Sequence, residues 1–197
     1  MKPSNYKCVI DLEASGLSSQ SYPIEVGIVL DTGQRYQSLI RPLEDWTHWD
    51  PSAEALHGIS RAELLKQGRP IRKVCEEINE LCLGQTLYSD CWVFDNSWLN
   101  NLFARAGIPR RFACAPIEMM LTEQQLGRFA ECKSAVSEHD SVAKHRAMND
   151  ALVIQKALHL LQGSANNPAT PESDSTARQV LPAATRSAAG PRVAQFL

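Results

Sequence analysis

The order of the apolar segments constrains the fold of this chain more than any other feature. A nearly continuous apolar run at 6–12 is typical of a strand that is buried on both faces of a sheet. Two more strand-like segments follow at 24–30 and 34–40, and the Asp-Thr-Gly at 31–33 predicts a short hairpin turn between them. Helical patterns then alternate with short strands. This order predicts an α/β sandwich with a mixed sheet, in which an antiparallel meander leads into parallel strands.

The later elements are predicted from apolar periodicity and from helix-start signals. Ser60, with Glu63 three residues on, resembles an N-cap with a capping box. The full set expected after residue 50 is a short helix at 53–56, the helix that Ser60 caps, an amphipathic helix from Pro70, a strand at 86–89, a helix at 94–106, a strand at 112–115, a mostly helical stretch at 116–142 and a helix at about 145–161.

Length and composition predict one folded domain followed by a tail. The chain has 197 residues, of which 44% are hydrophobic, so it can bury a substantial core. After residue 162 the sequence is rich in Ala, Ser, Thr and Pro and has no periodicity. We therefore expect a folded domain at 1–162 and a disordered tail at 163–197.

Charge, cysteines and apolar runs limit the class of protein. The net charge of −2 provides no global positive field, which argues against a protein that coats nucleic acid but not against an enzyme. None of the six cysteines forms a CxxC pair, so we expect them to be small buried hydrophobes in a reducing compartment. No apolar run approaches the roughly 20 residues needed to cross a bilayer. A cytoplasmic protein without a membrane partner is expected.

Four acidic residues occupy positions where a core would place apolar side chains. Asp11 and Glu13 end the first buried strand, and their spacing of two puts both side chains on one face. Asp95 and Asp150 each extend the apolar stripe of a helix, because apolar residues follow each of them at +4, +7, +8 and +11. A strand-end turn, an N-cap and a paired surface acid remain alternatives for the individual positions.

Together the four acids indicate a site for divalent cations. Unpaired buried charges would destabilise the domain by several kcal/mol each, so a cation must neutralise them, and the nearby basic residues are few and scattered. Hard divalent ions prefer oxygen ligands and suit phosphoryl-ester hydrolysis. His145 lies five residues before Asp150 and so cannot share its helix face. We expect it at the helix start, leaning over the site as a general base, with a surface or capping histidine as the alternative.

Three motifs in this chain resemble those of the DEDDh exonucleases, a family that includes proofreading subunits, RNase T and oligoribonuclease. They are Asp-x-Glu in VIDLEASGL, Asp95 in SDCWVFDNSWL and His-x4-Asp in HRAMNDA, and their order and spacing match over residues 6–160. The resemblance implies an RNase H-like fold, a mixed central sheet flanked by helices. It also implies single-stranded DNA or RNA as the substrate, and a homodimer is a possible assembly because family members are often dimers.

The resemblance assigns a role to each candidate residue. Asp11, Glu13, Asp95 and Asp150 would hold two Mg²⁺ or Mn²⁺ ions, with Glu13 also counted as catalytic. His145 would deprotonate the water that attacks the 3′-terminal phosphodiester, so that nucleoside 5′-monophosphates leave. The segment that contacts the terminal nucleotide would be Ser15, Gly16 and Leu17, with Leu17 as a wedge against the last base, and His57 is either a further substrate contact or a structural residue.

Some positions depart from the family pattern or leave alternatives open. Many members have Thr-Thr-Gly where this chain has Ala14-Ser15-Gly16, and His-Asn often stands where Asp90-Cys91 stands here. We expect Asp90 to be a surface residue, the alternative being that its charge demands tighter metal binding. Lys144 and Arg146 flank the proposed base and are candidates for phosphate contacts.

Two other functions remain open at this point. One is a catalytically silent module on an exonuclease fold that binds nucleic acid or protein. The other is a metal-dependent phosphatase or nucleotide hydrolase that acts on small molecules.

Overall fold

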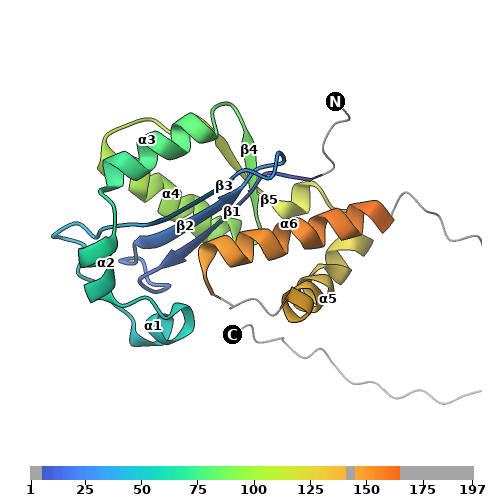
Figure 1. Cartoon of the computed structure of the whole chain (residues 1–197), viewed down its shortest axis with the longest axis horizontal. Coiled ribbons are helices and arrows are strands. Elements are labelled where there is room, and N and C mark those ends of the chain that lie inside the picture. The colour runs from blue at the N-terminus through green and yellow to red at the C-terminus, as the bar shows by residue number, and fades with distance from the viewer. Residues whose placement is uncertain (1–5, 141–144, 165–197) are drawn as a thin grey trace, which may run out of the picture. The chain divides into compact units, whose positions relative to one another are not determined.

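The described part of the chain forms one mixed sheet covered by helices on both faces (Figure 1). The structure is a computed structural model that describes residues 6–140 and 145–164. Five strands in these residues follow the order β3-β2-β1-β4-β5. The strands are β1 (Val9–Ala14), β2 (Pro23–Val29), β3 (Arg35–Leu39), β4 (Thr86–Ser89) and β5 (Ala113–Pro116). The first three pair antiparallel, whereas β4 pairs parallel with β1 and with β5, so the predicted mixed sheet is confirmed.

The helices occupy two layers. Figure 1 shows α3 and α4 on one side of the sheet and α6 with α5 on the other. The helices are α1 (Pro51–His57), α2 (Arg61–Gln67), α3 (Ile71–Leu81), α4 (Trp92–Ala106), a short 3₁₀ helix (Ile117–Met119), α5 (Glu123–Asp140) and α6 (Ala147–Ser164). No helix in the described ranges is long and apolar enough to cross a membrane.

The alternation of side chains along β1 divides the core into two parts. Ile10 and Leu12 point to the side covered by α3 and α4 and belong to the larger apolar cluster. Val9 points to the other side and packs with α6 residues such as Ile154 and Leu158. Because strand side chains alternate with a period of two, Asp11 and Glu13 lie on the same side as Val9. Both acids therefore face the layer that contains α6.

Local signals account for several of the element boundaries. Ser60 caps α2, because its hydroxyl accepts a hydrogen bond from the backbone N–H of Glu63, and this prediction is confirmed. The stretch 116–142 was expected to be mostly helical, and the structure divides it into the 3₁₀ helix and α5. The predicted tail at 163–197 lies almost entirely outside the described residues, except that α6 extends to Ser164.

The expectation that the cysteines are buried holds for only some of them. Cys8, Cys75 and Cys82 are buried in the larger apolar cluster, as predicted. Cys91 is exposed, and the expectation was wrong there because it precedes α4 at the edge of the sheet instead of lying on a core-facing stripe. All six are free thiols.

The start of α6 lies unusually close to the sheet at one glycine. Gly27 in β2 pairs with Asp11 of β1, and a Cβ atom built on Gly27 would lie 2.2 Å from the carbonyl carbon of Ala147. Only a residue without a side chain permits this approach. Gly27 thus sets how closely the first turn of α6 approaches the acids of β1.

We predict that Gly27→Ala destabilises the protein, because the added methyl must push backbone atoms of α6 away from the sheet. The free energy of unfolding, measured by urea denaturation, should fall by about 1–3 kcal/mol. The matched control is Gly127→Ala in α5, where nothing lies within 4 Å of the new Cβ. This control should gain about 0.5–1 kcal/mol, since alanine favours a helix interior. Equal behaviour of the two variants would contradict the close approach.

Candidate active site

Three predicted residues bring their ligand atoms together at the end of β1. One side-chain ligand atom each from Glu13, His145 and Asp150 lie within 4.8 Å of one another. Glu13 comes from β1, Asp150 comes from the first turn of α6, and His145 comes from the segment just before that helix. Residues more than 130 positions apart in the sequence therefore meet where α6 begins against the sheet.

The backbone around His145 explains its spacing from Asp150. His145 has a φ of 59°, and it is the one non-glycine residue with positive φ in the described ranges. Its backbone N–H donates to Asp150 Oδ2 at 3.0 Å. The carboxylate of Asp150 therefore holds the turn before α6, and the turn directs an exposed histidine toward the acids. A non-glycine residue in this conformation is strained and is often found at functional sites.

Asp11 and Asp95 lie beside this group but are more enclosed. Asp11 lines the cleft described below, two residues before Glu13. Asp95, in the first turn of α4, is 1% exposed, and its Oδ2 accepts a hydrogen bond of 2.5 Å from the hydroxyl of Ser89. Asp95 thus lies behind the surface of the cleft, and its assignment as a metal ligand stays a prediction.

Burial and mutual repulsion raise the pKa values of the acids. Burial raises the pKa of Asp11 well above its ordinary range, and the charges of Asp95 and Glu13 raise it further. Burial, followed by the charges of Asp150 and Glu25, raises the pKa of Glu13 to about 8. The pKa of Asp95 rises to about 7 because of burial, although the Ser89 hydrogen bond opposes the rise. These carboxylates resist ionisation unless a positive charge reaches them.

The donor set fits divalent cations. In the described residues, no lysine or arginine forms an ion pair with any of the four predicted acids. Carboxylate oxygens are the ligands that Mg²⁺, Mn²⁺ and similar hard ions prefer. Asp11, Glu13 and Asp150 are therefore placed to hold such ions, and the imidazole of His145 lies beside Glu13 and Asp150.

A cleft of 510 Å³ opens over these residues. Asp11, Glu13, Asp150 and His145 line its floor and one wall. The opposite wall comes from one face of α5 and from the residues before α4, namely Ala130, Lys133, Ser134, Ser137, Asp90 and Cys91. The cleft combines an acidic floor with a mixed rim.

Asp90 was expected to be a surface residue, and that expectation was wrong. Its side chain is 14% exposed and lies 2.5 Å from the Nζ of Lys133 on α5. Asp90 follows β4 directly, so it lies at the same end of the sheet as Asp11. Lys133 could not be predicted as its partner from local patterns, because the two residues are 43 positions apart.

A buried ion pair that the sequence analysis missed attaches α6 to the sheet. Glu25 in β2 is fully buried and lies opposite Glu13 in the neighbouring strand. Its carboxylate accepts hydrogen bonds from the guanidinium of Arg146, the shortest at 2.7 Å, and from the backbone N–H of Ala147 at 3.0 Å. Gln37 donates to it as well. Arg146 thus pairs with Glu25 in this structure, and its contact with a substrate phosphate stays a prediction. Lys144 lies outside the described residues.

The predicted substrate-binding residues fall into exposed and buried groups. Leu17 is 71% exposed and lines a separate hollow with Val93, Phe94 and Trp98 of α4. Ser15 is buried, and its hydroxyl accepts a hydrogen bond from the backbone N–H of Tyr22. Gly16 has a φ of 148°, and a Cβ there would lie 2.7 Å from His48. Contacts of Ser15, Gly16 and Leu17 with substrate stay predictions.

His57 is buried in the α1–α2 region. Its Nδ1 accepts a hydrogen bond from the backbone N–H of Ile59, and its ring lies edge-on to Trp49. Burial lowers its pKa. His57 does not line the acidic cleft, and its substrate contact stays a prediction.

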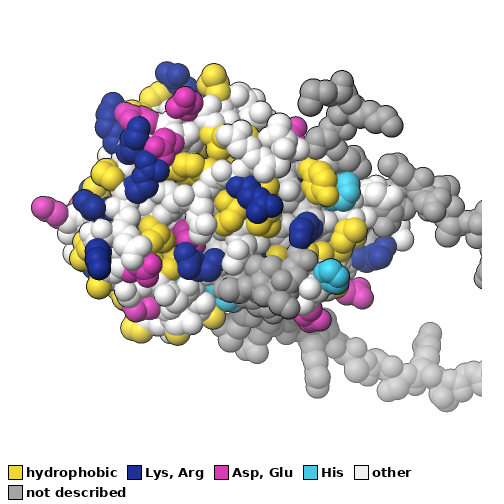
Figure 2. All heavy atoms as spheres, in the orientation of Figure 1, with side chains coloured by type: hydrophobic (Ala, Val, Ile, Leu, Met, Phe, Trp, Pro, Cys, Tyr) yellow, Lys and Arg dark blue, Asp and Glu magenta, His cyan; other side chains and the backbone are white. Residues whose placement is uncertain are grey.

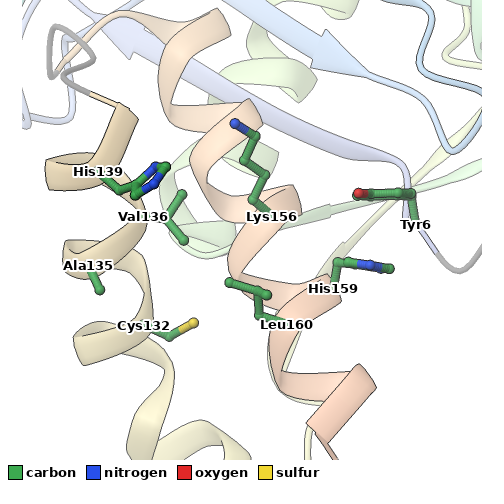
Figure 3. A pocket seen from close by; sticks show the side chains of 8 residues that line it. All are labelled: Tyr6, Cys132, Ala135, Val136, His139, Lys156, His159 and Leu160. Carbon is green, nitrogen blue, oxygen red and sulfur yellow. The ribbon is translucent and has the colours of Figure 1, made fainter.

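A second hollow, of 480 Å³, lies between α5 and α6 on the other face of α5 (Figure 3). Figure 3 shows Cys132, Ala135 and Val136 of α5 across from Leu160 of α6, with His159 beside Tyr6. The two rings stack with centroids 4.1 Å apart. This lining holds none of the four predicted acids, so the hollow is separate from the acidic cleft.

The sequence matches a known family over most of its length. A family model described as an exonuclease, RNase T, matches residues 8–158. The chain belongs to this exonuclease family. The family is of the DEDD type within the RNase H-like group, as the motifs predicted. No curated protein matches the chain at a significant level.

Solved structures of other exonucleases share the fold. The zinc-bound complex of Escherichia coli exonuclease I with single-stranded DNA has a TM-score of 0.63 and 14% identity, covering 82% of this chain and 41% of that one. A 3′-exonuclease that recognises the histone mRNA stem-loop has a TM-score of 0.60 and 15% identity, covering 83% of this chain and 84% of that one. Exonuclease I of Methylocaldum szegediense has a TM-score of 0.59 and 15% identity, covering 80% and 40%. The chain thus covers about two fifths of the length of these two exonuclease I chains.

We predict that the metal-free protein loses stability as pH rises. The pKa of Glu13 is raised from 4.5 to about 8, so the folded state holds a proton that the unfolded state releases. The stability contributed by that proton is present at low pH and is lost between about pH 4.5 and 8. Thermal unfolding in EDTA should therefore give a lower Tm at about pH 8 than at about pH 5.5, and Mn²⁺ should raise Tm more at the higher pH.

The control for this prediction is Glu13→Gln, which removes the titrating group while keeping its shape. The variant should show a weaker fall of Tm with pH in EDTA and a smaller gain with Mn²⁺. A wild-type Tm in EDTA that rises steadily over this pH range would contradict the repulsion among the acids.

We also predict that Arg146→Met destabilises the fold, because it leaves the buried carboxylate of Glu25 without its cation. The free energy of unfolding should fall by about 3 kcal/mol, the low end for a broken buried pair because Arg146 is partly exposed. The matched control is Arg72→Met, which removes an exposed i,i+4 pair with Glu76 on α3 and should cost less than about 1 kcal/mol. Urea denaturation measures both, and equal losses would exclude a special role for the Glu25 pair.

Proposed function

We propose that this chain is a metal-dependent 3′–5′ exonuclease that removes nucleoside 5′-monophosphates from single-stranded DNA or RNA. The observation that carries the proposal is the convergence of Glu13, His145 and Asp150 within 4.8 Å at the floor of an open cleft. Membership of the exonuclease family supports nuclease activity in general. The metal requirement, the direction and the two-ion mechanism are the parts that we propose.

The residues divide into ligands and a base. Asp11, Glu13, Asp95 and Asp150 would hold two divalent ions, Mg²⁺ or Mn²⁺. Such ions, when bound, activate a water molecule and neutralise the charge that develops on the phosphate and the leaving oxygen. His145 is exposed at the cleft, and we assign it the removal of the proton from the attacking water.

The turn before α6 positions this base. The hydrogen bond from the His145 backbone to Asp150 connects the histidine to a proposed ligand, and the Arg146–Glu25 pair anchors the next residue to the sheet. Catalytic groups act best when the protein fixes them before substrate arrives. The base is therefore attached to α6, which carries Asp150, and through Glu25 to β2, the strand that pairs with the Asp11 and Glu13 strand β1.

The hollow beside the loop after β1 would receive the terminal base. Leu17, Val93 and Phe94 are exposed apolar side chains on its lining, with Trp98 beneath, and Phe94 and Trp98 have ring centroids 5.6 Å apart. Apolar and aromatic surfaces bind unstacked bases without strong sequence preference. This arrangement supports a single-stranded 3′ end as the substrate, with Leu17 as the wedge.

Relatives with the same fold support the substrate class and the metal. Escherichia coli exonuclease I forms a complex with single-stranded DNA in a zinc-bound form, and the 3′-exonuclease recognises an mRNA stem-loop. We extend nucleic-acid binding and divalent-ion binding from these proteins to this chain. We further propose that residues 1–162 act as the catalytic domain, that 163–197 form a tail outside it, and that the protein works in the cytoplasm, as a monomer or a homodimer.

We predict that the purified protein shortens 5′-labelled single-stranded DNA or RNA from the 3′ end when Mn²⁺ is present. His145→Ala should lower the rate by about 10²–10⁴-fold, because the base is lost while the ligands remain. Asp11→Asn should abolish shortening. The matched control is His159→Gln, a histidine of α6 that stacks on Tyr6 away from the cleft and should leave the rate unchanged. Denaturing gels with labelled products measure the rate.

Other outcomes would assign a different function. Binding of the labelled strands without shortening, unaffected by His145→Ala, would identify a silent binding module. Release of phosphate from mononucleotides with oligonucleotides left intact would identify a small-molecule phosphatase. Shortening that begins at the 5′ end would contradict the proposed direction.

A further inference from the structure

The cleft has one fixed positive charge that the family motifs do not assign. Among the described residues that line the cleft, Lys133 is the one lysine or arginine. It projects from α5, an element that contributes none of the four acids, and it lines the same cleft as Asp11 and Glu13 of β1. A strand whose phosphates enter the cleft therefore meets an ammonium group as well as the acids.

The environment of Lys133 keeps its ammonium group charged and in place. Its Nζ lies 2.5 Å from Asp90 Oδ2, and its side chain is 34% exposed. Burial lowers the pKa of Lys133, but the charge and hydrogen bond of Asp90, followed by the charges of Asp11 and Asp150, raise it above its usual value. The field of the acidic cluster therefore holds the ammonium at the cleft.

The ammonium group has donors to spare for a ligand. A lysine ammonium carries three N–H donors, and among the residues that the structure describes its one hydrogen-bond acceptor is the carboxylate of Asp90. Asp90 occupies one side of the group, and the exposed third of the side chain opens to the cleft. The remaining donors are available to a phosphate oxygen without loss of the Asp90 contact.

Contacts other than this ion pair attach α5 to α6. On another face of α5, Phe129 belongs to the smaller apolar cluster and Cys132 packs against it, while Cys132 and Val136 line the second hollow between α5 and α6. Gln125 also donates to the backbone carbonyl of Leu161. Because these contacts attach the helix, the pair between Lys133 and Asp90 is free to serve the cleft.

We infer that Lys133 is a substrate-binding residue that contacts a backbone phosphate of the single strand, and that Asp90 positions it. The inference rests on the proposed exonuclease function for the identity of the polyanion. Among the described residues that line the cleft, the other ionisable side chains are carboxylates and one histidine. Lys133 therefore provides the fixed positive charge for a phosphate. Asp90 holds the lysine on the rim, where it meets the strand, and away from the ligand atoms of Glu13 and Asp150.

Salt-dependent binding tests the contact without requiring turnover. The probes are 5′-fluorescein-labelled oligothymidylate and oligouridylate, with Ca²⁺ in place of the catalytic ion, and the readout is fluorescence anisotropy over a KCl series. Each phosphate contact contributes about 0.7 to the slope of log Kd against log salt for a single strand. Lys133→Gln should lower this slope by about 0.7 and weaken binding about tenfold at low salt. Lys133→Arg should keep the slope.

Two further variants separate contact from structure. Lys73→Gln is the matched control, because Lys73 also pairs with a carboxylate, that of Glu77, but lies on α3 and does not line the cleft. Figure 2 shows basic and acidic side chains interspersed in the region of α3. It should leave slope and affinity unchanged. Asp90→Asn should weaken binding less than Lys133→Gln and keep the slope, because the lysine charge remains.

The outcomes decide between the alternatives. An unchanged slope in Lys133→Gln, with an unchanged thermal unfolding curve, overturns the inference, as does an equal loss of slope in Lys73→Gln. If the slopes of wild type and Lys133→Gln differ as predicted but the wild-type protein never shortens a strand in Mn²⁺, the proposed function fails while the phosphate contact stands. If it shortens strands and the slope is insensitive to residue 133, the contact fails alone.

Discussion

The ion pair between Glu25 and Arg146 is the interaction on which the geometry of the cleft depends. It connects the middle of β2 to the residue that follows His145, and the same carboxylate accepts the N–H of Ala147 at the start of α6. A fully buried carboxylate requires such complete pairing, since removing either partner would leave a charge in the core. The pair therefore fixes where α6 begins, and with it the places of His145 and Asp150 relative to β1.

Two glutamates on adjacent strands differ in the partners that the protein provides for their carboxylates. Glu13 and Glu25 are paired across β1 and β2, with their side chains on the same face of the sheet. The carboxylate of Glu25 accepts hydrogen bonds from the side chains of Arg146 and Gln37 and from the backbone N–H of Ala147. Within residues 6–140 and 145–164, no lysine or arginine forms an ion pair with Glu13, and burial with repulsion raises its pKa to about 8. The protein's own cation neutralises Glu25, and Glu13 is the acid that we propose binds a cation from solution.

The sequence predicts the strands and the acids well because both depend on local patterns. The apolar run of β1, the hairpin to β3 and the N-cap of α2 are encoded within a few residues, and the structure agrees with them. The acids Glu13 and Asp150 were singled out because charge replaces apolar side chains at periodic positions, and their ligand atoms do meet.

Contacts between distant segments were beyond sequence analysis. Glu25 lies in β2 as an ordinary charged residue, and only the placement of α6, 121 residues later, shows that it is buried and paired with Arg146. Asp90 was placed at the surface for the same reason, because its partner lies on α5. The division of 116–142 into a 3₁₀ helix and α5 was missed because neither element has a strong apolar period.

The cleft has a floor and a wall that come from different parts of the chain. The proposed ligands and base belong to β1, to the start of α4 and to the start of α6, whereas the facing wall is one side of α5. Substitutions on that side of α5 can alter which strands fit without touching a ligand. Substrate range and hydrolytic chemistry are thus encoded separately, so one could diverge among relatives while the other stays constant.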